Sequence, residues 1–432
     1  MADKKLLIVQ CAALSEPLDL PGLTFARADS VFPAVTCTIQ ASFRTAAPPS
    51  AHGMIANGLF VRPLRRAMFW EQSSGLVEGP RIWDAVRAAG RRVGILFWQQ
   101  SLGESADVIL SPQPIHKHHG GMIESCYDCP RGLYDRLRTR MGQRFRLRDY
   151  WGPLASPRAG DWIADATAAV IADAGLLGSP PPDLLLTYLP TLDYDLQRFG
   201  PGGKGTGEAR NALRRQLETL LAAARDNDYD VLVFGDYAIA RCERAVYPNR
   251  ALAAANLLRT RDVAGMTYAD LWASPAFALV DHEVAHVYTQ GQSETAAAAE
   301  VLRSLAGVAE VLDRDAQHAR GVDHPNSGEL VVIAEQGAWL SYPWWTDRSR
   351  APDFATHVDI HNKPGFDPCE LRMAWWPPLS VRQDAGAVAG SHGRTGDGRE
   401  IVWACTCPLP GPVDDVIDLA ESVRRATGDW WL

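Results

Sequence analysis

The chain alternates short continuous apolar runs with amphipathic segments. A run of apolar residues bounded by polar ones, as at 5–14, is typical of a strand buried on both faces in a parallel sheet. The segment from Pro80 to Gly90 instead has apolar residues at the spacing of one helix face, and the run RRVGILFWQ after it predicts a strand. This succession predicts a β-α-β unit of a doubly wound sheet. Further strands are expected at 183–189 and in YDVLVFGD, and further helices at 161–174, 208–225 and 293–307.

Two stretches interrupt this alternation. Residues 102–160 are rich in Gly, Pro, His and Arg and have little periodicity, and residues 245–272 have the composition of a small subdomain. Substrate selectivity commonly resides in such insertions. We therefore expect a single domain over residues 1–432, with cap insertions at about 102–160 and 240–275.

Composition narrows the class of protein. With 432 residues and 47% apolar content, the chain can bury a large core. Its net charge of −8 argues against binding to a nucleic-acid backbone. The first apolar run is soon interrupted by Ser15-Glu16-Pro17, so it is too short for a signal segment or a membrane span, and no later run reaches that length. These features predict a cytoplasmic protein without a membrane span.

Eight cysteines in a chain of this length do not form a disulfide framework. Cys126 and Cys129 form a CxxC pair, and three histidines precede it. This pattern leaves two interpretations open, a small structural zinc site and a solvent-facing loop with incidental thiols. The residues concerned are His116, His118, His119, Cys126 and Cys129.

Thr36 is the strongest candidate for chemistry. It follows Pro33-Ala34-Val35, where a helix can begin. A hydroxyl on the first turn of a helix lies in the field of unpaired N–H groups, which suits a nucleophile that attacks phosphorus or sulfur. The alternative interpretation is that Thr36 only caps the helix, a common role for threonine.

The run PAVTCTIQASF, followed by Thr45, Pro48-Pro49, His52-Gly53 and Asn57-Gly58, resembles the nucleophile segment of the type I phosphodiesterase/nucleotide pyrophosphatase family of the alkaline phosphatase superfamily. The resemblance implies a three-layer α/β/α fold with a mostly parallel central sheet. It also implies hydrolysis of a small-molecule phosphate monoester or diester, in which Thr36 attacks and Asn57 holds a phosphoryl oxygen. Two divalent ions, zinc or alternatively manganese, would assist.

Three further segments continue the resemblance. The family pattern D-x-x-x-H-x-x-G-P becomes Asp193, Gln197, Gly200 and Pro201, and the family's Asp-His-Gly becomes Asp236-Tyr237-Ala238. His392, in AGSHGR, matches the family's last ligand. The resemblance thus assigns Asp193 and His392 to one ion, with Gln197 beside them, and Asp236 with Thr36 to the other. The alternative interpretation of Asp193 is that it only caps the end of a strand.

The family's ligand set is incomplete in this chain. Ala12, Gln197 and Tyr237 stand where the resemblance expects Asp, His and His. The phrase DHEVAHVY offers replacements, either as a helix with two histidines on one face or as a strand that lines the site. The 359–361 segment either lines the site or is a loop held by its own hydrogen bonds. The replacement ligands considered are Asp281, His282, His286, Asp359 and His361.

Three outcomes follow from this incomplete set. The chain keeps two metals through replacement ligands, works with one metal, or is a catalytically silent relative that binds a phosphorylated ligand or a partner protein. Loss of a direct ligand usually costs much metal affinity, which is why the number of ions is left open.

Overall fold

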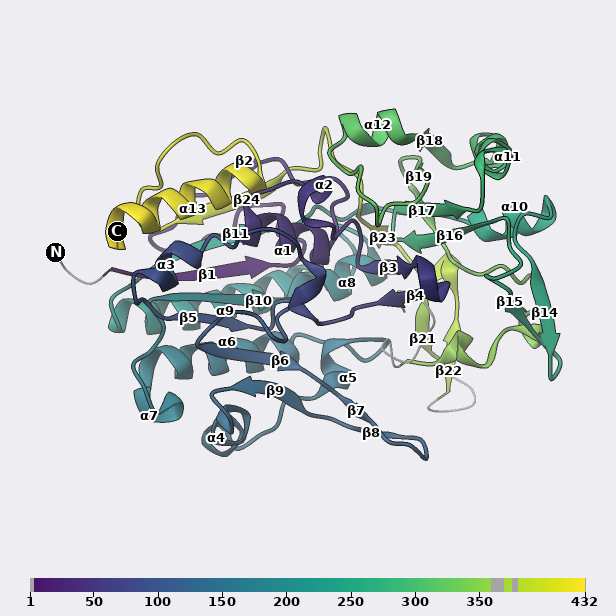
Figure 1. Ribbon diagram of the computed structural model, residues 1–432. Coiled ribbons are helices and arrows are strands. Elements are labelled where there is room, and N and C mark those ends of the chain that lie inside the picture. Colours follow the sequence, from purple (N-terminus) through teal and green to yellow (C-terminus); the bar gives the residue numbers. More distant parts are fainter. Residues whose placement is uncertain (1–3, 359–368, 375–379, 432) are drawn as a thin grey trace.

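The computed structural model describes residues 4–358, 369–374 and 380–431 (Figure 1). In this part of the chain the largest sheet has eight strands in the order β2-β24-β11-β1-β10-β5-β6-β9. The five neighbouring strands from β11 to β6 are parallel, whereas β24 pairs antiparallel with β11, and β9 with β6. The bounds are β1 Lys5–Cys11, β2 Ala26–Ala28, β5 Val93–Leu96, β6 Val108–Pro112, β9 Cys126–Cys129, β10 Leu184–Leu189, β11 Tyr229–Gly235 and β24 Ile401–Cys405.

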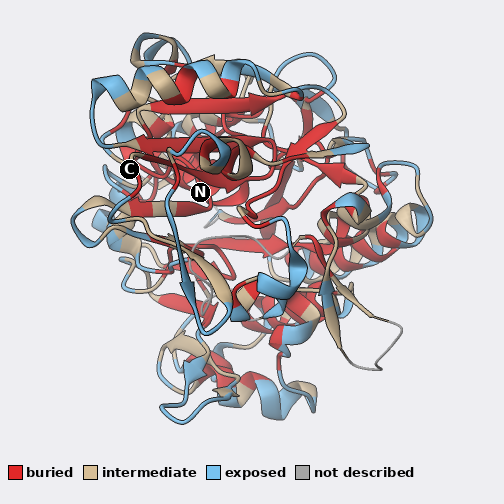
Figure 2. Ribbon diagram, turned by 90° about the vertical axis from the view of Figure 1, so that its right-hand side faces the viewer, coloured by how far each residue is buried: buried red, intermediate tan, exposed pale blue. Residues whose placement is uncertain are grey.

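The central strands form because their residues are apolar on both faces. In β1, every residue from Leu6 to Cys11 is buried, and Leu6 is in register with Leu184 of β10 and Asp230 of β11. Burial on both faces requires helices above and below the sheet. Figure 2 shows this buried interior surrounded by exposed helix faces and loops.

Two groups of helices cover the sheet. One face packs against α6 Arg158–Ala172 and α9 Thr206–Asp226, with α8 Thr191–Phe199 beside α9. The other is covered by α1 Thr36–Thr45 and α13 Val416–Trp431, with α3 Asp84–Ala88 beside α13 (Figure 1). The predicted three-layer α/β/α fold with a mostly parallel central sheet is therefore confirmed.

A second, four-stranded antiparallel sheet lies beside the carboxyl ends of the main sheet (Figure 1). Its order is β16-β17-β19-β18, and α10 and α11 pack on it. It has its own apolar core, centred on residues such as Phe277, Val287 and Leu330. The bounds are α10 Pro248–Ala254, β16 Ala276–Asp281, β17 Val284–Thr289, α11 Gln292–Arg303, β18 Val308–Leu312, α12 Arg314–Ala319 and β19 Leu330–Ala334.

Short elements complete the fold. They include β3 Gly58–Val61, β4 Arg66–Phe69, α4 Leu133–Met141, α5 Leu147–Tyr150, β12 Ala240–Arg241, β13 Arg244–Val246, β14 Thr260–Val263, β15 Met266–Ala269, β20 Ala338–Leu340 and β23 Gly390–Ser391. The stretch 102–160 is not purely a cap, because β6 and β9 extend the main sheet. Among the described residues, no helix has the length and apolar character needed to cross a bilayer.

Candidate active site

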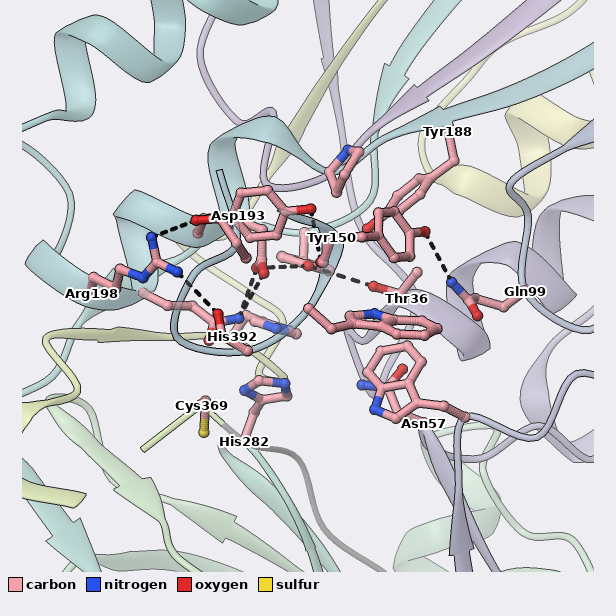
Figure 3. A pocket seen from close by; sticks show the side chains of 18 of the residues that line it. Thr36, Asn57, Gln99, Tyr150, Tyr188, Asp193, Arg198, His282, Cys369 and His392 are labelled. Atoms are coloured by element: carbon pink, nitrogen blue, oxygen red, sulfur yellow. Dashed lines mark hydrogen bonds between the residues drawn. The ribbon is translucent and has the colours of Figure 1, made fainter. Parts of the chain in front are cut away.

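The candidate active site lies where parallel strands of the main sheet end. Ligands bind outside the carboxyl ends of the strands in open α/β sheets. Here the residues that follow β10 and β11 meet the first turn of α1 around a cavity of about 100 Å³ (Figure 3). The second sheet closes this cavity through the turn between β16 and β17. Its polar and aromatic lining includes Thr36, Asn57, Trp70, Gln99, Tyr150, Trp151, Tyr188, Asp193, Gln197, Arg198, Tyr237, His282 and His392.

Thr36 is the first residue of α1 and is almost fully buried. The N-cap residue is Val35, which has an extended conformation and no capping side chain, so Thr36 is not the N-cap. The helix end is instead held by Asn57, whose Oδ1 accepts a hydrogen bond of 3.0 Å from the backbone N–H of Cys37. The hydroxyl of Thr36 therefore faces the cavity at the positive end of the helix dipole.

A chain of hydrogen bonds leads from Thr36 to Asp193. The Thr36 hydroxyl lies 3.5 Å from the Tyr237 hydroxyl, which donates to Asp193 Oδ1 at 2.9 Å (Figure 3). Gln197, one helical turn after Asp193 in α8, donates its Nε2 to both carboxylate oxygens at 2.8 and 3.0 Å. The Thr36–Tyr237 contact is long, as is common before a substrate tightens an active site.

Tyr237 is held in place by stacking. Its ring lies parallel to the ring of His392, with 3.6 Å between centroids and 2° between planes. His392 Nδ1 lies 2.8 Å from the carbonyl oxygen of Ala34, an acceptor, so this nitrogen carries the proton. Burial lowers the pKa of His392 well below its ordinary value, and neighbouring His282 lowers it further. The pKa of the Tyr237 phenol is raised well above its ordinary value, chiefly by burial, so the phenol is a proton donor to Asp193.

The second sheet contributes His282 through a two-residue hairpin turn. Asp281 pairs with Val284 across this turn, and His282 has φ 57, a left-handed conformation typical of such tight connections. The next residue, Glu283, is fully buried and pairs with Arg399 at 2.8 Å. The backbone N–H of Glu283 also donates to the carbonyl of His392, so the turn and the His392 segment are fastened together.

Asp281 does not line the cavity but orients Asn57. Its Oδ2 accepts from the backbone N–H of Asn57 at 2.7 Å, and its Oδ1 accepts from Asn57 Nδ2 at 3.1 Å. Burial raises the pKa of Asp281, whereas His282 and Asn57 act in the opposite direction. These contacts support a positioning role for Asp281, and they do not support the prediction that it is a metal ligand.

Asp236 lies behind the cavity, with its carboxylate oxygens occupied by protein donors. Oδ1 accepts from the backbone N–H groups of Ala13 and Tyr237 at 2.9 Å each, and Oδ2 accepts from Gln10 Nε2 at 3.1 Å. Burial raises the pKa of Asp236 to about 8, while these three donors favour the carboxylate. The loop after β1 approaches closely here, since a Cβ at Gly235 would collide with the carbonyl oxygen of Leu14.

His286 lies apart from the cavity. It is in β17, a strand, and the helical alternative for this phrase is therefore wrong. Its Nε2 lies 3.1 Å from the carbonyl of Ile55, and its Nδ1 accepts from the N–H of Gly328 at 3.3 Å, so both ring nitrogens have structural partners. Asp359 and His361, the other predicted replacements, lie outside the residues that the structure describes.

The residues present do not fit the two-ion centre that the resemblance implies. A divalent ion needs carboxylates and imidazoles with lone pairs directed at it. At one position Ala12 offers only a methyl group and the oxygens of Asp236 are already bonded. At the other, Asp193 already accepts from Tyr237 and Gln197. Across the described ranges, no three side chains of His, Cys, Asp or Glu gather to hold a metal ion, and this includes the cysteine pair of β9.

Sequence reasoning missed several lining residues. Tyr188 comes from inside β10, and Trp70, Tyr150 and Trp151 come from the rim, where Trp70 and Trp151 lie 6.4 Å apart between centroids. Arg198 donates to the carbonyls of Ala155 and Gly152, at 2.8 and 3.1 Å. Of these residues, only Arg198 could have been found from the sequence, because it directly follows Gln197 in the family-like segment.

A known protein family matches most of this chain. The family model described as type I phosphodiesterase / nucleotide pyrophosphatase matches residues 20–367. The chain belongs to this family. Membership supports a hydrolase of the phosphodiesterase/pyrophosphatase type and agrees with the resemblance drawn from the Thr36 segment. No curated protein sequence matches the chain.

Solved structures share the fold of this family member at low sequence identity. Phosphonoacetate hydrolase from Sinorhizobium meliloti 1021 in complex with phosphonoformate is 15% identical, with a TM-score of 0.61 over 98% of this chain and 96% of that one. Murine ectonucleotide pyrophosphatase/phosphodiesterase 5 is 13% identical, with a TM-score of 0.58 over 98% and 95%. An inactive form of the murine protein is known in complex with AMP. At these identities the similarity shows the fold.

Proposed function

We propose that this chain hydrolyses a small-molecule phosphate ester by nucleophilic attack of Thr36 on phosphorus. The observation that carries the proposal is the position of the Thr36 hydroxyl, which is on the first turn of α1, faces the cavity and is within reach of Tyr237. Unpaired N–H groups at a helix N-terminus attract phosphoryl oxygens, and they stabilise the charge that these oxygens carry in the transition state.

Asn57 supplies a second contact for the phosphoryl group. Its Oδ1 is bonded to the N–H of Cys37, and one hydrogen of its Nδ2 is bonded to Asp281, so the amide is fixed in orientation. A primary amide has a second N–H, and we assign this one to a phosphoryl oxygen. Because Asp281 holds the amide before substrate arrives, no reorganisation is needed during the reaction.

The charge of the lining favours a diester over a monoester. Among the described lining residues, and apart from the two histidines, the charged side chains are Asp193 and Arg198, which cancel. A phosphodiester carries one negative charge at neutral pH, whereas a monoester carries close to two. A cavity without net positive charge stabilises the singly charged ester better, which also agrees with the family description.

Hydrolysis of bis(p-nitrophenyl) phosphate and p-nitrophenyl phosphate tests the proposal. Thr36→Ala removes the nucleophile and is expected to lower kcat by roughly 10⁴-fold or more. The matched control is Thr38→Ala, because Thr38 is in the same helix turn, is buried, and lies outside the cavity lining. Equal rates for wild type and Thr36→Ala would remove the nucleophile assignment. If the wild type binds the ester tightly but does not hydrolyse it, the proposed hydrolase activity is wrong and the chain is a binding protein for phosphate esters.

A further inference from the structure

The Tyr237 phenol occupies a distinctive place in the site. It contacts the Thr36 hydroxyl on one side and the Asp193 carboxylate on the other, at 3.5 and 2.9 Å. These are the two groups that the family resemblance assigns to different ions. We infer that Tyr237 takes the place of the divalent ions in this chain, and that the Thr36 proton leaves through Tyr237 to Asp193. The proton path rests on the proposed hydrolysis.

Hydrogen bonding is the first argument. Asp193 accepts three hydrogen bonds, one from Tyr237 and two from Gln197, which satisfy both of its oxygens. An ion at Asp193 would compete with these donors for the carboxylate, and Gln197 could offer it only a single amide oxygen, a poor ligand for zinc. The carboxylate is thus built to receive N–H and O–H groups.

Stacking is the second argument. The Tyr237 ring lies 3.6 Å from that of His392 and parallel to it, and His392 is itself fixed by the carbonyl of Ala34 and lies 3.9 Å from the ring of His282. Tyr237 is buried, so its phenol cannot swing into solvent to vacate the position. A rigid phenol aimed at Asp193 is a structural part of the site.

The second ligand position gives the third argument. Asp236 bonds to Ala13, Gln10 and the backbone of Tyr237 itself. It lies outside the cavity lining, and Ala12 supplies no carboxylate. The same backbone segment therefore leaves Asp236 outside the cavity lining and brings the Tyr237 side chain to Thr36.

The proposed reaction accounts for every proton and bond without a metal cation. Thr36 Oγ forms a bond to phosphorus while the bond from phosphorus to the leaving oxygen breaks. The Thr36 proton passes to the Tyr237 oxygen as the Tyr237 proton passes to Asp193, and p-nitrophenolate leaves as an anion. Water then attacks the phosphothreonine. Asp193 returns its proton through Tyr237 to Thr36, and the released phosphate keeps both protons of the water.

Metal content gives a test that does not depend on turnover. Protein purified without chelator is analysed for zinc, manganese and other divalent metals, and its thermal unfolding is recorded with EDTA, Zn²⁺ or Mn²⁺. We expect metal far below one ion per chain and no rise in Tm with either ion. A stoichiometric metal, or a saturable rise in Tm that EDTA reverses, would overturn the inference.

The proton path is tested with Tyr237→Phe, which keeps the ring stacked on His392 and removes only the hydroxyl. We expect kcat to fall by about 10²- to 10⁴-fold, the range for proton transfer by a positioned group, with KM little changed. Tyr288→Phe is the matched control, because its hydroxyl bonds to the carbonyl of Asn326 at 2.8 Å, outside the cavity. A Tyr237→Phe variant as active as Tyr288→Phe would contradict the path.

The two proposals fail in different ways. If the wild type turns over esters, but only after Zn²⁺ or Mn²⁺ is added, hydrolysis by Thr36 stands and the replacement of the ions by Tyr237 is refuted. If the wild type is inactive with and without added ions, the proposed hydrolysis and the proton path both fail. In that case the metal analysis still decides whether the phenol excludes the ions.

Discussion

His286 gives a quantitative prediction about stability, because its imidazole is completely buried in β17. Burial lowers its pKa from an ordinary 6.5 to about 4. Between pH 4 and pH 6.5, His286 therefore binds a proton in the unfolded chain but not in the folded chain. Stability from this residue is fully present above pH 6.5 and is lost as the pH falls toward 4.

The magnitude follows from the size of the pKa difference. A shift of one pKa unit corresponds to about 1.4 kcal/mol, so the full difference corresponds to about 3 kcal/mol. Linkage then gives a loss of about 1.4 kcal/mol by pH 5.5 and between about 2 and 3 kcal/mol by pH 4.5. This is a large fraction of the unfolding free energy of an ordinary domain.

The assay compares the wild type with His286→Gln. Glutamine has both a donor and an acceptor for the carbonyl of Ile55 and the N–H of Gly328, but it does not titrate. Urea unfolding, followed by tryptophan fluorescence from pH 7.5 to 4.5, gives the free energy of each protein. The difference between the two curves isolates His286 from other acid-sensitive groups such as His52, whose pKa burial lowers to about 3. If the stabilities of the two proteins fall in parallel with pH, the reasoning is refuted. If His286→Gln has a different metal content from the wild type, His286 becomes a candidate ligand again.

Two further predictions concern buried electrostatics. Glu283→Gln leaves the buried guanidinium of Arg399 without its partner and should cost about 3–5 kcal/mol in urea unfolding, whereas Glu335→Gln, in a half-exposed pair with Arg244, should cost under about 1 kcal/mol. Similar losses for the two variants would contradict this. Asp236→Ala leaves three buried N–H donors unpaired and should cost roughly 3 kcal/mol or more, again by urea unfolding, without altering metal content. A variant as stable as the wild type would contradict this cost, and a variant that loses a bound metal would show that Asp236 is a ligand.

The strands of the main sheet were predictable because the signal is local. The apolar runs of β1, β10 and β11 are buried on both faces, so each run alone indicates a parallel strand. The boundaries were less predictable. The helix expected from Pro80 to Gly90 covers only Asp84–Ala88, and β6 and β9 come from a stretch without clear periodicity.

Site residues were predictable where residue type and position in the chain determine the role. They were not predictable where the role depends on partners that are distant in sequence. Thr36, Asn57, Asp193 and His392 reach one cavity, as the family-like order of segments indicated. The role of Tyr237 depends on stacking against His392, 155 residues further along (392 − 237), and no local pattern reports that contact. The DHEVAHVY phrase was ambiguous for the same reason, since pairing with β16 and β19 makes it a strand.

The close approach of Leu14 to Gly235 has a consequence for any attempt to engineer a metal site here. The conformation of the loop after β1 is fixed by its backbone, because Ala13 has φ 58 and donates its N–H to Asp236. An aspartate placed at position 12 would therefore directly precede the backbone N–H that Asp236 already accepts. Building a metal site here would require new partners for the donors that now bond to Asp236, as well as a carboxylate at position 12.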